Sequence, residues 1–263
     1  MKTMTWVAMG LVLPALLPSA ACGGSKKKQY TVDATATEYS FTMPDEIKAG
    51  LVTFNTANKG GLYHEFALAK LEDGKTVDDV NALIASGAQE TPDWITDIGG
   101  VPVLSPGHGE KLTRKLDPGT YVFICFIPGP DGAPHVMHGM VKLFTATGDS
   151  QAKAPSADGT IVSTDDAFQV PAIKAGTRTL ELKNTGSKPH EFTLISLADG
   201  KSIADVQAWF EAGGQGDAPA TFLGGQQTVQ PGESMWLTLD LQKGQSYTLV
   251  ESEDLRTADF TAS

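Results

Sequence analysis

Short runs of apolar and β-branched residues, separated by glycine and proline, recur along most of this chain. Residues 51–55 and 179–183 are β-prone segments bounded by glycine, and residues 235–239 follow a Pro-Gly turn. Residues 121–126 are apolar at nearly every position, which is typical of a central strand covered on both faces. The pattern predicts a chain built mostly of short β-strands.

Two stretches have the periodicity of an amphipathic helix. Thr76 with Asp79, and Ser202 with Asp205, can each cap the start of a helix. Apolar residues then fall on one face of each segment: Val77, Val80, Leu83 and Ile84 in the first, and Ile203, Val206 and Phe210 in the second. We expect both faces to pack on the core rather than to hold a cofactor.

The sequence contains a tandem repeat with an offset of 125 to 126 residues. Ile-Lys-Ala-Gly at residues 47–50 returns at 173–176, and His-Glu-Phe at 64–66 returns at 190–192. An offset of this length indicates duplication of a whole domain rather than a solenoid. We therefore predict an all-β fold of two tandem β-sandwich domains, each with one short inserted helix.

The N-terminus has the pattern of an export signal. A lysine, an apolar run and small residues precede Cys22. A Cys directly after small residues resembles the bacterial lipoprotein box, in which that Cys carries lipid. The predicted organisation is signal peptide 1–21, lipidated tether 22–29, first domain 30–146, linker 147–158 and second domain 159–263.

This N-terminus predicts a lipid-anchored protein at the extracytoplasmic face of the cell membrane. A simple signal peptide cut nearby is the alternative, and the protein is then secreted. No later stretch has 18 consecutive apolar residues, so no transmembrane helix is expected.

The net charge and the absence of certain motifs limit the classes of partner that this chain is expected to bind. The chain has 20 Lys and Arg against 31 Asp and Glu, a net charge of −11. No nucleic-acid partner is expected, because the phosphate backbone requires a basic face. The sequence shows neither a glycine-rich phosphate loop nor a Gly-x-Ser-x-Gly nucleophile motif, and no small-molecule substrate is evident.

The chain has two cysteines, Cys22 and Cys125. If Cys22 is lipidated, Cys125 is a lone thiol in an oxidising compartment, and metal ligation would explain it. The alternatives are an inert buried Cys, or a disulfide with an unlipidated Cys22.

The residues around Cys125 favour a metal. His135 and Met140 follow Cys125 in one loop, and His64 lies about sixty residues earlier at the start of another predicted strand. Two imidazoles, one thiolate and a weak thioether are the ligand set of a blue-copper electron-transfer site. The sequence therefore predicts one mononuclear type 1 copper ion in the first unit.

The first unit resembles the cupredoxins, the family of plastocyanin and azurin. The resemblance rests on the Asn-Lys-Gly-Gly-Leu-Tyr-His approach to His64, the Pro-Gly-Thr-Tyr-Val-Phe-Ile-Cys strand ending at Cys125, and the His135–Met140 loop. It implies a Greek-key sandwich with His64 and His135 as imidazole ligands, Cys125 as the thiolate and Met140 as the axial ligand. Two features depart from it: the Cys-to-His loop is longer than in plastocyanin or azurin, and Glu65 stands where many cupredoxins have Asn.

Three other residues in the first unit are weaker candidates for metal ligands. His108 lies in a turn, where we expect it to be exposed. His138 could compete with His135 as a ligand, although His135 fits the loop spacing of the family. Met137 is expected to be a packing or exposed loop residue, with a second soft copper contact as the alternative.

The second unit lacks most of the ligand set. His190 matches His64, but aligning Tyr121 with Tyr247 places Glu251 at the position of Cys125 and Thr261 at that of His135. We expect no copper there and a structural role for His190. A weak zinc site with Glu251 is the alternative.

Copper nitrite reductases and multicopper oxidases also contain cupredoxin repeats, but they need further histidines. This chain has five His in all, so the sequence predicts that it is not an enzyme. The leading hypothesis is a carrier of single electrons with redox-protein partners. A copper buffer or delivery protein with a copper-transfer partner is the first alternative, favoured by Met137 and His138. A scaffold, or a subunit of a copper oxidoreductase, is the second.

Overall fold

The computed structural model describes residues 29–87 and 90–263. The first half contains β1 Thr31–Thr37, β2 Ser40–Thr42, β3 Glu46–Lys48, β4 Gly50–Asn58, β5 His64–Leu71, α1 Val77–Ala85, β6 Ile95–Leu104, β7 Gly109–Leu116, β8 Gly119–Ile124, the 3-10 helix η1 His135–His138 and β9 Val141–Thr147. The second half contains β10 Gly159–Ser163, β11 Phe168–Gln169, β12 Gly176–Asn184, β13 His190–Leu197, α2 Ile203–Glu211, β14 Ala220–Val229, β15 Ser234–Leu241, β16 Ser246–Val250 and β17 Thr257–Thr261.

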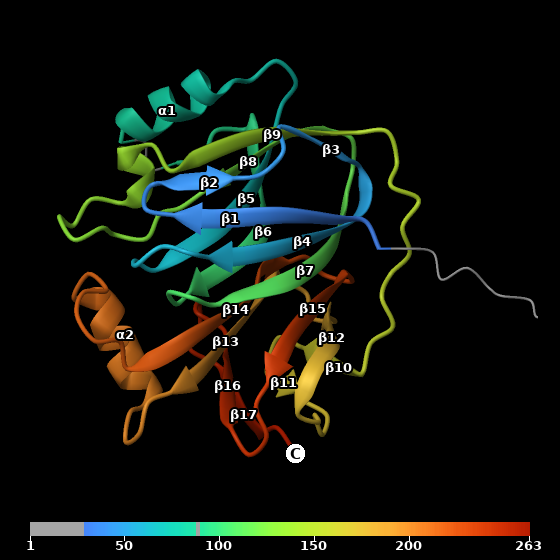
Figure 1. The fold of residues 1–263 in the computed structure, drawn as a ribbon, viewed down its shortest axis with the longest axis vertical. Coiled ribbons are helices and arrows are strands. Elements are labelled where there is room, and N and C mark those ends of the chain that lie inside the picture. Colours follow the sequence, from blue (N-terminus) through green and yellow to red (C-terminus); the bar gives the residue numbers. More distant parts are fainter. Residues whose placement is uncertain (1–28, 88–89) are drawn as a thin grey trace, which may run out of the picture.

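Within the described residues the strands form two long sheets that both run through the two halves. One sheet has the order β11-β10-β12-β15-β7-β4-β1-β2, and the other has the order β17-β16-β13-β14-β6-β5-β8-β9-β3. Each half therefore contributes to both sheets and forms a sandwich of its own, with the first half above the second in Figure 1. The predicted all-β fold of tandem sandwiches is confirmed.

Equivalent strands of the repeat meet at the junction between the halves. β7 pairs antiparallel with β15, and Leu112 lies opposite Leu237, its own counterpart in the repeat. β6 also pairs antiparallel with β14, its own counterpart strand, with Leu104 opposite Leu223. Antiparallel pairing of equivalent strands relates the halves by an approximate two-fold axis. The junction is therefore a continuation of both sheets rather than a loose contact.

One buried apolar cluster extends through both halves. In the first half, the rings of Phe54 and Phe123 lie 5.4 Å apart, and in the second half those of Phe168 and Phe192 lie 5.5 Å apart. Aromatic contacts of this kind add to the stabilisation that burial of the rings provides. This core fixes the ends of β5 and β8, where the candidate ligands are found.

The two predicted helices are present, and their N-termini have the predicted capping boxes. Thr76 caps α1 with Asp79, and Ser202 caps α2 with Asp205. The predicted apolar faces are only partly buried. Val80 and Val206 pack into the protein, whereas Val77 and Phe210 are 38% and 37% exposed. Each helix has nine residues, and part of its apolar face stays in contact with solvent.

The predicted signal peptide and Cys22 lie outside the described residues. In the part of the chain that the structure describes, no helix has the length and apolar character needed to cross a membrane. The first element of the described chain is β1, which begins at Thr31.

Candidate metal centre

Three predicted ligands come together at one end of the first sandwich. β5 begins at His64, and β8 runs antiparallel beside it and ends one residue before Cys125. The chain then forms a loop that returns at η1, which begins with His135. All three side chains are fully buried. Residues far apart in the sequence are thus placed together by strand pairing and by one loop.

The ligand atoms of these residues converge on one point. The Nδ1 atoms of His64 and His135 are 3.1 Å apart, and the Cys125 Sγ atom lies 3.9 Å from the first and 3.4 Å from the second. Among the described residues this is the group of His, Cys, Asp and Glu side chains close enough to hold a metal ion.

Backbone hydrogen bonds hold the ligand loop closed. The amide of Cys125 donates to the carbonyl of Met140 at 3.3 Å, and the amide of Met140 donates to the carbonyl of His135 at 3.1 Å. Gly139 ends η1 in the left-handed region, at φ 91°, a conformation that glycine adopts without strain. The turn at Gly139 places Met140, which is fully buried, at the end of the loop that carries Cys125 and His135.

Burial keeps the metal-free site neutral. It lowers the pKa of His64 to about 4 and holds the pKa of His135 below its ordinary value. It also raises the pKa of the Cys125 thiol to about 12. Three buried donors that face one another with no compensating charge are a favourable environment for a cation, since a bound metal replaces the thiol proton. The donor set of two imidazoles and one thiol fits a type 1 copper ion.

Both imidazoles also have a second nitrogen with no hydrogen-bond partner. The Nε2 atoms of His64 and His135 are buried and unpaired. A ligand histidine in a metal site usually donates from its other nitrogen to a nearby acceptor. The surroundings of these two atoms therefore bear on how the ligands are held.

The turn between β1 and β2 covers the site. The Tyr39 ring meets His135 edge-on, with ring centroids 5.2 Å apart, and lies 4.5 Å from the ring of His138. Beside it, the Glu38 carboxylate accepts a hydrogen bond from the amide of Gly61, which holds the pKa of Glu38 below its usual range. The sequence analysis missed both residues of this turn, because no ligand motif includes them.

His138, the alternative ligand, is engaged elsewhere. Its Nε2 atom lies 3.0 Å from the Asp131 carboxylate, and the cluster of metal-binding side chains in the described chain does not include it. Met137 is 55% exposed. His108, expected to be exposed, is half-buried instead, because its Nδ1 atom lies 3.1 Å from the carbonyl of Pro106. Cys125 is a free thiol in the described chain.

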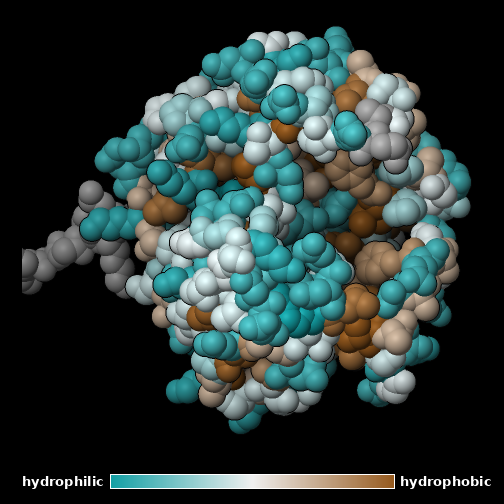
Figure 2. Space-filling view, turned by 180° about the vertical axis from the view of Figure 1, so that it is seen from behind, coloured by the Kyte–Doolittle hydropathy of each residue, from teal (hydrophilic) through white to brown (hydrophobic). Residues whose placement is uncertain are grey.

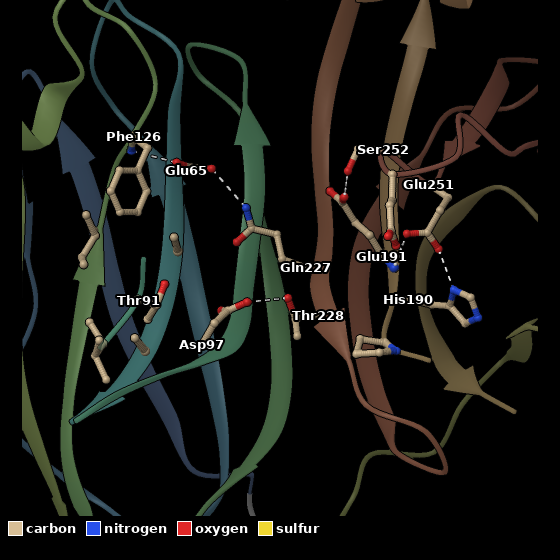
Figure 3. Close-up of a pocket in the computed structure, with 16 residues that line it drawn as sticks. Glu65, Thr91, Asp97, Phe126, His190, Glu191, Gln227, Thr228, Glu251 and Ser252 are labelled. Carbon is tan, nitrogen blue, oxygen red and sulfur yellow. Dashed lines mark hydrogen bonds and ion pairs between the residues drawn. The ribbon is translucent and has the colours of Figure 1, made fainter. Parts of the chain in front are cut away.

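Glu65 connects the ligand strands to the second half of the chain. Its carboxylate accepts one hydrogen bond from the amide of Phe126 at 2.8 Å and another from the Gln227 side chain at 3.1 Å (Figure 3). Burial raises the pKa of Glu65 to about 7. The side chain that departs from the family pattern is thus a link between the site and the junction of the sandwiches.

A cleft of about 440 Å³ lies between the two halves beside Glu65. Its lining includes four more carboxylates, from Asp97, Glu191, Glu251 and Glu253. Figure 3 shows Asp97 of β6 bonded to Thr228 of the neighbouring β14, and Glu191 bonded to Ser252 within the second half. Figure 2, the view from behind, shows a hollowed surface with hydrophobic side chains exposed on part of its wall.

In the second half, the guanidinium group of Arg256 occupies the equivalent site. Glu251 lies 2.9 Å from the Nδ1 atom of His190, and the guanidinium of Arg256 lies 3.0 Å from Glu251 and 3.1 Å from the same Nδ1 atom. The guanidinium thus contacts the two atoms that correspond to the ligand atoms of His64 and Cys125. The sequence analysis missed Arg256 because nothing at the equivalent position of the first unit draws attention to it.

Comparisons with known proteins give matches among solved structures; no protein-family model and no curated protein matches. Reduced auracyanin from Roseiflexus castenholzii is 21% identical over 46% of this chain and 98% of its own, with a TM-score of 0.32. Copper nitrite reductase from Nitrosomonas europaea is 14% identical over 90% of this chain and 94% of its own, with a TM-score of 0.24. A multi-copper oxidase from Pediococcus acidilactici is 14% identical over 89% of this chain and 56% of its own, with a TM-score of 0.27. All three TM-scores lie below 0.5, so the fold rests on the strand order described above and the candidate ligands on their geometry.

The prediction that the chain is not an enzyme is contradicted by these comparisons. Solved structures that match about nine-tenths of the chain include copper nitrite reductases and a multi-copper oxidase, which are enzymes. The prediction relied on the count of histidines in a single chain. That count cannot exclude catalysis, because a second chain can complete a metal site at an interface.

Proposed function

We propose that this chain binds one copper ion through His64, Cys125 and His135, with Met140 as the axial ligand, and that it transfers single electrons at this site. The observation that carries the proposal is the convergence of two imidazole Nδ1 atoms and one thiol sulfur, all buried, within 4.8 Å of one another. Bound copper supplies the one-electron chemistry, because this ligand set supports both Cu(I) and Cu(II).

The residues of the chain provide a rigid and dry site. His64 and Cys125 lie at the ends of paired strands, and loop hydrogen bonds fix His135 and Met140. Full burial of all four side chains excludes water as an additional ligand. Ligands that are already in place need little rearrangement when the charge of the site changes, which favours electron transfer.

Two exposed apolar side chains flank the ligands. Phe126 follows Cys125 directly and is 50% exposed, and Met137 lies two residues beyond His135 and is 55% exposed. Apolar groups near a buried redox centre suit a transient contact with a redox protein, the partner class that we propose. The exposed Met137 thioether also favours a second candidate function, in which the protein passes copper to a transfer partner.

We further propose that Cys22 is lipidated and anchors the chain at the extracytoplasmic face of the cell membrane. The fold supports a defined orientation on such an anchor. β1 has seven residues, and it runs from Thr31 to the turn that covers the ligands. At 3.3 Å per residue, its length is about 23 Å. The site would therefore face away from the membrane, where a water-soluble partner can reach it.

A visible spectrum during titration of the purified chain with Cu(II) tests the proposal. We expect an intense blue band from thiolate-to-copper charge transfer, complete at one equivalent and abolished in Cys125→Ser. His135→Ala should lose the band, and the matched control His138→Ala should keep it. Tight Cu(I) binding without the band would favour copper delivery. Binding of neither ion would overturn both functions.

A further inference from the structure

The buried Nε2 atom of His64 needs a partner once a metal is bound. The Nδ1 atom of His64 points to the other ligands, so the ring proton has to reside on Nε2. A buried N–H group without an acceptor is costly, and Nε2 has no hydrogen bond in this structure. The question is which group on the chain can accept from it.

The Glu38 carboxylate lies beside this nitrogen. A Cβ atom added to Gly60 would lie 3.0 Å from His64 Nε2 and 2.9 Å from Glu38 Oε1, so both atoms border the same small space over Gly60. The amide of Gly61 holds Oε1 in place by a hydrogen bond. The carboxylate and the imidazole nitrogen are therefore neighbours across this space, and a side-chain rotation of Glu38 is the movement that would join them.

The second half of the chain already contains the bond in question. His190, the counterpart of His64, has its Nε2 atom 3.3 Å from the Asp165 carboxylate. Asp165 is held by the amide of Ser187, as Glu38 is held by that of Gly61. A Cβ atom at Gly186 would lie 2.5 Å from the imidazole nitrogen and 2.4 Å from the carboxylate. The two halves thus share one arrangement of carboxylate, glycine and histidine.

We propose that Glu38 accepts a hydrogen bond from the Nε2–H group of His64 in the copper-loaded protein and so positions that ligand. The inference rests on the proposed copper function and adds a residue that the ligand motif does not contain. Glu38 carries negative charge and touches no copper in this role; it acts through His64 alone. Gly60 is required because a side chain there would enter the space between carboxylate and imidazole.

This role predicts a selective effect on the oxidised site. An anionic acceptor makes the imidazole a stronger donor, which favours Cu(II) over Cu(I). Glu38→Ala should weaken Cu(II) binding about tenfold, the lower end of the range for such partners, because the Glu38 side chain is exposed. Cu(I) binding should change much less. A tenfold selective loss corresponds to a reduction potential raised by about 59 mV.

The experiment measures the dissociation constants of Cu(II) and Cu(I) and the reduction potential for the full chain and four variants. Glu38→Gln keeps a neutral acceptor and should fall between wild type and Glu38→Ala. Gly60→Ala should resemble Glu38→Ala, since Gly60 does not have the positive φ that would strain alanine. Asp165→Asn, the matched change in the second half, should leave all three quantities at the wild-type values.

The outcomes separate this inference from the copper function. If wild type shows the blue band and both Glu38 variants keep the wild-type potential, Glu38 has no positioning role. Equal losses of Cu(I) and Cu(II) affinity in Glu38→Ala would indicate general damage to the site and would also overturn the inference. If wild type itself binds no copper, the failure lies with the proposed function.

Discussion

Replacement of Glu65 by glutamine should stabilise the metal-free chain above pH 7 and leave it almost unchanged at pH 4.5. Burial raises the pKa of Glu65 to about 7 in the folded protein, from an ordinary value of 4.5. The folded chain therefore binds the Glu65 proton more tightly than the unfolded chain does. The stability associated with this group is fully present below pH 4.5 and is lost as the pH rises through 7.

The magnitude follows from the two pKa values. The difference between about 7 and 4.5, at 1.36 kcal/mol per pKa unit, corresponds to about 3 kcal/mol. Glutamine keeps the oxygen that accepts from the amide of Phe126 and removes the buried charge. Its amide group also faces Gln227, which can turn its own amide over to restore a donor and an acceptor. A gain close to this magnitude is thus expected at pH 8.

Urea unfolding of wild type and Glu65→Gln at pH 4.5 and pH 8, followed by tryptophan fluorescence, measures the effect. Glu191→Gln is the matched control, because Glu191 occupies the same position in the repeat and its pKa is also raised by burial. It should give a change of the same sign. If the difference between wild type and Glu65→Gln is the same at both pH values, the carboxylate is not held in the folded state as described.

Three further predictions concern charge at the two sites. Burial lowers the pKa of His64 to about 4, so the unfolded chain binds this proton more tightly than the folded chain does. As the pH falls from 6.5 to 4, the free energy of unfolding of the metal-free chain should therefore drop by up to about 3 kcal/mol. The same urea assay on His64→Gln should lack this loss. Free copper at a thousand times its dissociation constant should stabilise the folded chain by about 4 kcal/mol, visible in calorimetry as a raised Tm that Cys125→Ser does not show. Arg256→Met leaves the buried Glu251 carboxylate without its cation and should cost about 3–5 kcal/mol in urea unfolding, whereas Lys115→Met, at an exposed pair, should cost little.

Most of the architecture could be predicted from local patterns. The capping residues Thr76 and Ser202 mark helix starts in the sequence and in the structure alike. The repeat offset indicated two copies of one domain, and the spacing of Cys125 and His135 indicated that one copy had a complete ligand loop. Such features depend on neighbours in the sequence or on a fixed motif, so they can be read without knowledge of tertiary contacts.

The remaining features depend on contacts that no local pattern encodes. Glu38 and Tyr39 reach the site because the turn after β1 folds over it, and neither lies in a ligand motif. Arg256 reaches His190 from the far side of a loop. Val77 and Phe210 lie on the apolar faces that the helical periodicity predicts, yet both side chains remain exposed in the fold. Periodicity identifies the apolar face of a helix, but packing decides how much of that face is covered.

The two halves show two solutions to the same electrostatic problem. A histidine fixed at the start of a strand, facing the end of the neighbouring strand, forms a buried cluster of donors in both copies. In the second half, Glu251 replaces the thiol and Arg256 supplies a permanent cation, so the cluster is complete within the chain. In the first half the corresponding donors are a thiol and a second imidazole, with no cationic side chain bonded to them in the described structure. The cluster in the first half therefore requires an external cation, whereas Arg256 already supplies one in the second half. This contrast explains why a metal is expected in only one half of a nearly symmetric molecule.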